Sequence, residues 1–179
     1  NPYLLACEYQ RTLRDLGIDA SLYRVHDPNF EQFAPLFESS REYAGALRAV
    51  PVLSDPSMLL PFDALFFGSP TYFGNVSSAM KACMDGCSVF WTDAALEGKL
   101  FGAFASASTP QGAGDVCLLA LNIFAQHMGM YPLPVPANIA GCAQPAYGIL
   151  HYSGETALNR PDAKTYAAIR DYLTRVVKR

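Results

Sequence analysis

The chain has 179 residues, which is enough for one domain with a sizeable hydrophobic core. Hydrophobic residues make up 51% and charged residues only 16%, so some apolar surface is expected to be covered by another subunit. The net charge is −3 with no early cluster of Lys and Arg, and no apolar run reaches membrane-spanning length, so neither a nucleic-acid partner nor membrane insertion is expected.

A helix is predicted first, with Asn1 as N-cap, Pro2 at the first helical position and Gly17 just beyond the end. A strand over residues 18–25 follows. A helix that precedes the first strand is unusual for a parallel sheet, because the crossover lacks the strand that feeds it. We therefore expect residues 1–179 to be a single domain whose first strand, and most of the loop after it, lie upstream of residue 1.

Residues 26–60 contain four prolines and one helical piece near Ser40–Arg48, which indicates a long surface excursion. The apolar run Ala64–Phe67 then predicts a strand buried on both faces of a parallel sheet. A loop over residues 69–75 follows directly. Open α/β sheets bind ligands at the carboxyl ends of their strands, so this loop is the first candidate for a binding site.

The spacing of Val76, Met80, Cys83 and Cys87 predicts a helix, capped by Asn75 or Ser77. A second small apolar strand is predicted over residues 100–105, and a polar loop over residues 106–115 comes after it.

Residues 116–128 form a helical pattern that is apolar nearly all round, which indicates burial against another subunit. A short, proline-broken edge strand over residues 130–135 and a last helix from Pro161 complete the chain. With the expected upstream strand, this order predicts an α/β fold with a doubly wound, parallel, five-stranded sheet of flavodoxin type. Its strand order would be 2-1-3-4-5, with helices on both faces.

The candidate loops are rich in Ser, Thr and Gly and contain no strong base, which suits a flat polar ring and a phosphate at a helix N-terminus. No P-loop, zinc-protease or nucleophile-elbow motif is present, and the three histidines are scattered, so no metal site is expected. Five cysteines without C-x-x-C indicate a reducing, cytoplasmic setting. If the protein is an enzyme, a bound cofactor must supply the reactivity, and no catalytic side chain is expected.

The loop sequence G-S-P-T-Y-F-G-N resembles the flavin-loop motif T-P-T-R-F-G-N of the WrbA-type NAD(P)H:quinone oxidoreductases, in the flavodoxin-like superfamily. Downstream, V-F-W-T-D-A-A-L-E-G-K-L is similar to that family's G-L-W-x-S-G-x-L-x-G-K, Q-H-M-G-M to H-x-G-M, and A-Y-G to P-Y-G. The resemblance runs from about Asp63 to the C-terminus and is weaker over the first helix.

This resemblance implies a flavoprotein in which residues 70–73 wrap the FMN ring and residues 106–111 contact its edge and ribityl chain. Trp91 would form one wall of the cavity above the flavin. His127 would face this cavity, in its own or a neighbouring subunit. The implied FMN-binding residues are Asn1, Pro2, Ser69, Pro70, Thr71, Tyr72, Phe73, Gly74, Asn75, Ser106, Ala107, Ser108, Thr109, Pro110, Gln111 and His127; the implied substrate residues are Trp91, His127 and Tyr147.

Simpler interpretations stay open for three of these residues. Trp91 and Tyr147 could be packing residues, and His127 could be a core histidine. The chain also departs from the family pattern: Tyr72 replaces an arginine, Pro110 and Gln111 replace part of a glycine run, and the segment 136–146 is shorter.

The resemblance therefore implies an FMN-dependent oxidoreductase, a quinone reductase that passes a hydride from NADH or NADPH through the flavin to quinones in a two-electron reduction. We expect a cytoplasmic homo-dimer or homo-tetramer. Two alternatives remain: a flavodoxin-like single-electron carrier, which usually shows a strongly acidic face, and a flavodoxin-fold interaction protein without flavin.

Overall fold

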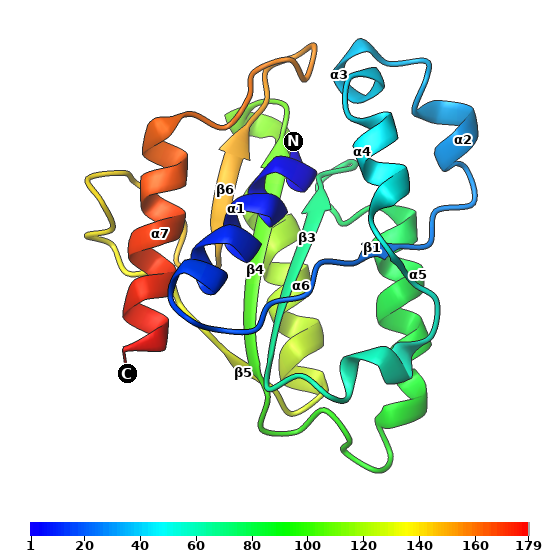
Figure 1. Ribbon diagram of the computed structural model, residues 1–179, viewed down its shortest axis with the longest axis vertical. Coiled ribbons are helices and arrows are strands. Elements are labelled where there is room, and N and C mark those ends of the chain that lie inside the picture. The colour runs from blue at the N-terminus through cyan, green and yellow to red at the C-terminus, as the bar shows by residue number, and fades with distance from the viewer. Residues whose placement is uncertain (179) are drawn as a thin grey trace.

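The computed structural model describes residues 1–178, which form an α/β fold with parallel strands between two layers of helices (Figure 1). The predicted α/β class, with parallel strands and helices on both faces, is confirmed. The predicted single five-stranded sheet of order 2-1-3-4-5 stays a prediction, since the described strands form one sheet of four strands and one of two. The strands are β1 (Arg24–Val25), β2 (Val52–Leu53), β3 (Ala64–Pro70), β4 (Leu100–Ala107), β5 (Tyr131–Pro132) and β6 (Ile149–Tyr152).

Strand β4 is the centre of the larger sheet. It pairs with β3 over seven residues, from Ala64 beside Leu100 to Pro70 beside Ser106. On its other side β4 pairs with β5 near its start and with β6 near its end. A separate two-stranded sheet contains β1 and β2, and every one of these pairings is parallel.

Helices cover both faces of the larger sheet, as Figure 1 shows. One hydrophobic core joins α1 and α7 to the sheet, and the other joins α5 and α6 to its opposite face. The helices are α1 (Pro2–Asp15), α2 (Phe30–Phe33), α3 (Glu38–Arg41), α4 (Ala44–Ala49), α5 (Ser78–Gly86), α6 (Gly114–His127) and α7 (Ala163–Val177), with 3-10 turns η1 (Pro56–Leu59), η2 (Cys87–Phe90) and η3 (Pro110–Gly112).

Several boundaries differ from the sequence prediction. Only Arg24–Val25 of the predicted strand over residues 18–25 pairs, because the preceding residues line a cleft instead. Strands β2 and β6 were not predicted, and the helical piece near residues 40–48 is two short helices. Strand β3 buries alternate residues rather than both faces, since the face toward α1 borders the same cleft.

The cysteines are free thiols in the part of the chain that the structure describes. Cys87 is fully buried, and burial raises the pKa of its thiol to about 12, so this thiol stays protonated and fills the core. Among residues 1–178 no helix has both the length and the apolar character needed to cross a membrane.

Candidate functional site

The loop after β3 ends in an aromatic tip. The backbone N–H of Tyr72 donates to the carbonyl of Asn75 over 2.9 Å, and the N–H of Asn75 donates back over 3.0 Å. The two residues between them, Phe73 and Gly74, have φ angles of 49° and 75°, the left-handed conformation that closes a two-residue turn. This turn pushes Phe73 completely into solvent, and Tyr72 is 58% exposed.

Buried hydroxyl groups hold this loop from below. Ser69 is fully buried; its Oγ donates to the carbonyl of Pro70 over 2.8 Å and accepts from the N–H of Ser77 over 2.9 Å. We call the edge of the sheet at which β3, β4 and β6 end the rim. Because Ser69 is enclosed in this way, it shapes the loop and does not face the rim. The side-chain oxygen of Thr71 is also buried, beside the thiol of Cys117, whose pKa burial raises despite these neighbouring hydroxyls.

The loop after β4 lies directly against the first one. The N–H of Thr71 donates to the carbonyl of Ser106 over 2.8 Å, and a Cβ placed on Gly74 would lie 3.3 Å from the Cβ of Ala113. Ser106 and Ala107 are buried in the strand end, whereas Ser108, Pro110 and Gln111 are exposed. Helix α6 begins just beyond, with no side chain that caps its N-terminus.

A third segment, residues 153–160, completes this side of the rim and was not predicted. The N–H of Ser153 donates to the carbonyl of Ala107 over 2.8 Å. Beside it, the Nε2 of buried His151 donates to the carbonyl of Asn159 over 2.9 Å, since a carbonyl oxygen can only accept. Burial lowers the pKa of His151 and so keeps the ring neutral near pH 7.

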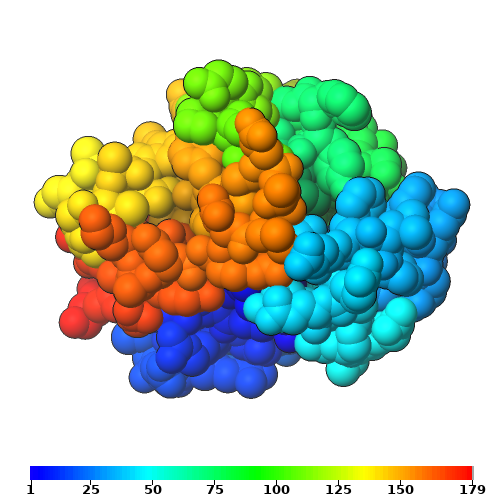
Figure 2. Space-filling view, turned by 90° about the horizontal axis from the view of Figure 1, so that it is seen from above, coloured from blue at the N-terminus to red at the C-terminus, as the bar shows by residue number. Residues whose placement is uncertain are grey.

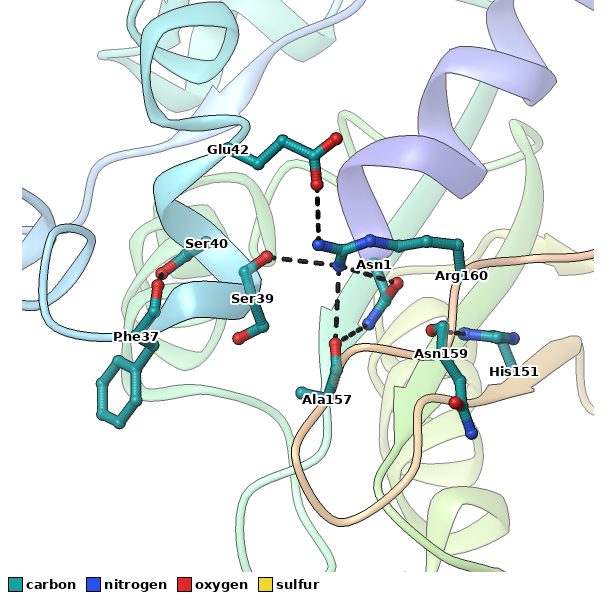
Figure 3. A network of polar contacts seen from close by, with 9 residues as sticks. All are labelled: Asn1, Phe37, Ser39, Ser40, Glu42, His151, Ala157, Asn159 and Arg160. Atoms are coloured by element: carbon teal, nitrogen blue, oxygen red, sulfur yellow. Dashed lines mark hydrogen bonds and ion pairs between the residues drawn. The ribbon is translucent and has the colours of Figure 1, made fainter.

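Arg160 ties this segment to both the start of α1 and the excursion after β1 (Figure 3). Its guanidinium donates to the Oδ1 of Asn1 over 3.4 Å, to the carbonyl of Ser39 over 3.2 Å and to the carboxylate of Glu42 over 3.1 Å. The Nδ2 of Asn1 donates to the carbonyl of Ala157 over 2.9 Å, so this side chain does not cap α1. The only sequence signal for Arg160 was the Arg-Pro pair before the last helix.

Figure 2 looks down on this edge of the molecule. The segment after β6, in orange, lies at the centre, with green atoms of the loops after β3 and β4 above it and the excursion after β1, in cyan and light blue, at its right. The structure thus brings together the two loops predicted from the sequence and the predicted residues Asn1 and Pro2, and adds the segment 153–160.

The predicted substrate residues lie elsewhere in the same chain. Trp91 and His127 are at the opposite edge of the sheet, where the N–H of Gly98 donates to the carbonyl of Gly129 over 3.0 Å. The eight residues of β4 separate the two edges by roughly 25 Å. Tyr147 precedes β6, and its carbonyl accepts from the amide of Asn122 over 2.7 Å.

Exposure decides between some of the alternatives. His127 is exposed, so the interpretation as a core histidine is wrong. Trp91 is 66% exposed and is not packed in the core. Neither residue can reach the rim of its own chain, so a role for them in flavin or substrate binding requires the rim of a neighbouring chain.

The rim fits a flavin nucleotide better than a metal or a hydrolytic centre. Both α1 and α6 start at this edge without a side-chain cap, so backbone N–H groups and helix dipoles are available to a phosphate. The aromatic tip at Tyr72 and Phe73 offers flat apolar surface to a ring system. Within residues 1–178, no group of three or more His, Cys, Asp or Glu side chains could hold a metal ion.

Comparison with known proteins agrees with this geometry. Residues 1–144 match the family described as NADPH-dependent FMN reductase. A curated "NAD(P)H dehydrogenase (quinone)" from Chromohalobacter salexigens is 33% identical over 120 residues, which is 67% of this chain and 57% of that protein. One of the same description from Methanosarcina acetivorans is 33% identical over 129 residues, 67% of this chain and 58% of that protein. The matched stretch is less than two thirds of either relative.

Solved structures share the fold. A flavodoxin, WrbA-like protein from Agrobacterium tumefaciens superposes with a TM-score of 0.53 at 19% identity, over 87% of this chain and 92% of that one. A flavodoxin from Fusobacterium nucleatum bound to flavin mononucleotide has a TM-score of 0.54 at 13% identity, over 87% and 95%. The flavodoxin-like fold and the resemblance to quinone oxidoreductases are thereby confirmed, and the chain belongs to the NADPH-dependent FMN reductase family.

Proposed function

We propose that this chain is the flavin-binding part of an FMN-dependent oxidoreductase that transfers a hydride from NAD(P)H to quinones in a two-electron reduction. The observation that carries the proposal is the rim itself. An exposed aromatic turn and two uncapped helix N-termini lie together at the carboxyl edge of the sheet. When bound, FMN supplies the hydride and two-electron chemistry that the side chains of this rim lack.

Each part of the rim has a distinct task in this proposal. The turn at residues 70–75 covers the ring, and Ser108 to Gln111 supply polar groups to its edge and to the ribityl chain. The N-terminus of α1 attracts the phosphate, and Arg160, which is paired with Glu42, holds the side chain of Asn1 in place beside it. Tyr72 stands where the resembled family has an arginine, so the ring meets a neutral aromatic face here.

A homo-oligomer is the second part of the proposal. Val116, Leu119 and Ile123 form an apolar stripe on α6 and are 52%, 37% and 46% exposed in the single chain. A second copy packed on this stripe would cover the apolar surface. It would also allow Trp91 and His127 of one chain to approach the rim of another, which their position in their own chain prevents.

Flavin titration followed by an NAD(P)H–benzoquinone assay tests the enzyme. We expect the protein to bind FMN and then to catalyse rapid, flavin-dependent oxidation of NAD(P)H. The variant Phe73→Ser should weaken FMN binding, whereas Val89→Ser, which places the same residue at an exposed site away from the rim, should not. A colourless protein that ignores added FMN would refute the proposal and favour the flavin-free alternative.

Analytical ultracentrifugation tests the oligomer. A buried carboxylate is costly, so Ile123→Glu should shift the protein to monomer, while Val177→Glu on α7 serves as a control because Val177 lies outside the stripe. If wild-type protein is monomeric across the micromolar range, Trp91 and His127 have no role in the site.

A further inference from the structure

Three large apolar side chains stand exposed on the excursion after β1. Phe33, Leu36 and Phe37 are 46%, 63% and 57% exposed, and they lie at the end of α2 and in the turn before α3. We call these three residues the excursion patch. Single exposed apolar residues are ordinary, whereas a group of them is often a binding surface.

Polar bonds hold the turn that carries the excursion patch. The Oγ of Ser40 donates to the carbonyl of Ala34 over 2.8 Å and to that of Phe37 over 3.1 Å. The Nε of Arg41 donates to the carbonyl of Pro35 over 3.2 Å. The turn is therefore braced by its own residues, while its apolar side chains remain exposed to water.

The excursion patch lies beside the rim. Arg160, in the segment that completes the rim, donates to the carbonyl of Ser39 over 3.2 Å, and Ser39 is two residues beyond Phe37. Figure 3 shows Phe37 and Ser39 on one short stretch of chain, next to Arg160 and Asn1. A molecule bound at the rim can therefore extend onto the patch.

A hollow of about 330 Å³ lies between α3 and this segment of the rim. Its wall residues are Glu38, Arg41, Glu42, Leu158 and Arg160. Leu158 is 38% exposed, so apolar surface is present on the rim side of the hollow as well as on the excursion. The two glutamates and two arginines cancel in charge, so the hollow does not favour an ionic ligand over a neutral one.

The size of the excursion patch fits an alkyl chain better than a protein partner. With about 200 Å² for a side chain of this kind, the exposed fractions leave roughly 300 Å² of apolar surface. A stable protein interface needs about 800 Å² from each partner. A methylene group carries about 30 Å², so roughly ten methylenes would cover the patch.

The chemistry of the two substrates decides which of them could supply such a chain. NAD(P)H is ionic and carries no apolar chain, whereas a quinone is neutral and can carry an alkyl substituent on its ring. We propose that the excursion patch binds the alkyl chain of the quinone while the quinone ring reaches the flavin at the rim. The enzyme therefore prefers alkylated quinones to short ones. This inference rests on the proposed function.

Steady-state kinetics with methylbenzoquinone and decylbenzoquinone test this preference on the FMN-loaded protein. The two rings are substituted alike and differ in the length of the chain. We expect KM to be at least tenfold lower for the decyl compound with kcat unchanged, because the chain adds binding energy and takes no part in hydride transfer. Equal KM values would overturn the proposal.

A double variant locates the effect. Leu36→Ser with Phe37→Ser should raise KM for decylbenzoquinone to the value for methylbenzoquinone and leave the kinetics with methylbenzoquinone unchanged. Leu36→Met with Phe37→Leu keeps the surface apolar and should keep the preference. Val89→Ser with Val177→Ser, at two exposed sites off the patch, should also keep it. A preference that survives in the first variant would overturn the assignment of the patch.

Hydrogen exchange on the oxidised, FMN-loaded protein gives a measurement without turnover. Decylbenzoquinone should slow exchange over residues 33–41 at least threefold, and methylbenzoquinone should not. Slower exchange that depends on protein concentration without quinone would overturn the proposal in favour of a second copy of the chain. Slower exchange with phosphatidylcholine vesicles but not with decylbenzoquinone would overturn it in favour of a lipid surface.

The kinetics separate the two levels of the argument. If neither quinone supports oxidation of NAD(P)H, the proposed function fails, and the preference for alkylated quinones fails with it. If both quinones are reduced with the same KM, the preference alone fails and the proposed function stands.

Discussion

The two edges of β3 have opposite surroundings. On one side β3 bonds along its whole length to β4, of which every residue but Leu100 is buried. On the other side lies the cleft toward β1, where the lining residues include Leu13, Leu22 and Leu53, which are only half-buried. One strand therefore divides a tightly packed half of the molecule from a loosely packed half, and the same substitution should cost more on the β4 side than on the β1 side.

The largest effect is expected at Gly148, on the packed side. A Cβ at this position would lie 2.2 Å from the carbonyl oxygen of Ala103, a backbone atom that cannot rotate away. Gly148→Ala should thus prevent β6 from pairing with β4 and lower the free energy of unfolding, measured by urea denaturation, by about 4 kcal/mol.

Gly45→Ala is the matched control, because Gly45 lies in α4 with no atom within 4 Å of the added Cβ. It should be neutral, or stabilising by up to about 1 kcal/mol through helix propensity. Equal destabilisation by both changes would contradict a packed β4 side.

A pair of leucines compares the two sides directly. Leu118 is fully buried beneath β4, so Leu118→Ala should cost about 3 kcal/mol, counting the cavity that it leaves. Leu53 borders the cleft, so Leu53→Ala removes fewer contacts and should cost about 1 kcal/mol or less. If the two costs prove equal in chemical denaturation, the wall at β1 is as well packed as the core.

Ser69 links the packed half to the rim. Ser69→Ala leaves the partly buried N–H of Ser77 without its acceptor, and this should lower the free energy of unfolding by about 2 kcal/mol. Hydrogen exchange at Ser77 should accelerate as well. Ser108→Ala, at an exposed hydroxyl of the neighbouring loop, should leave the melting temperature within a degree or so of wild type.

The smallest effect concerns pH. Burial lowers the pKa of His151 below its ordinary value of 6.5, and the hydrogen bond to Asn159 opposes this only in part. Between these two pKa values the unfolded chain binds the proton and the folded chain does not. Stability should therefore be complete above about pH 6.5 and decline as the pH falls toward the folded pKa.

His151→Gln isolates the part of the pH dependence of the free energy of unfolding that comes from His151. Gln keeps a donor for the Asn159 carbonyl but does not titrate. The difference between the two unfolding curves removes the contributions of all the other titratable groups, which the two proteins share. Identical slopes for the two proteins would show that His151 can be protonated without cost in the fold.

The sequence predicted the parts of the fold whose pattern is local. The apolar runs of β3 and β4 and the periodic helices α1, α6 and α7 each carry their own signal, and the structure confirms them. Strand β2 was not predicted because its two residues are paired only through contact with β1. The strand predicted over residues 18–25 is mostly unpaired, since pairing requires a neighbour that the sequence pattern cannot supply.

The candidate site was predictable to the same extent. The loops after β3 and β4 follow from strand-end position and motif together. Arg160 was not predicted as a residue of the site, because its partners Asn1 and Glu42 are more than a hundred residues away in sequence. Trp91 and His127 came from the resemblance alone, and the motif does not reveal that a helix carries each of them to the far edge of the sheet.

The position of Trp91 makes it a spectroscopic reporter. It is the only tryptophan in the chain, it stands 66% exposed in the turn after η2, and the rim is at the opposite edge of the sheet. Fluorescence from this single indole should change little when the rim is altered. It should shift strongly toward shorter wavelengths whenever another surface excludes water from that edge, so contact between copies can be followed without any added label.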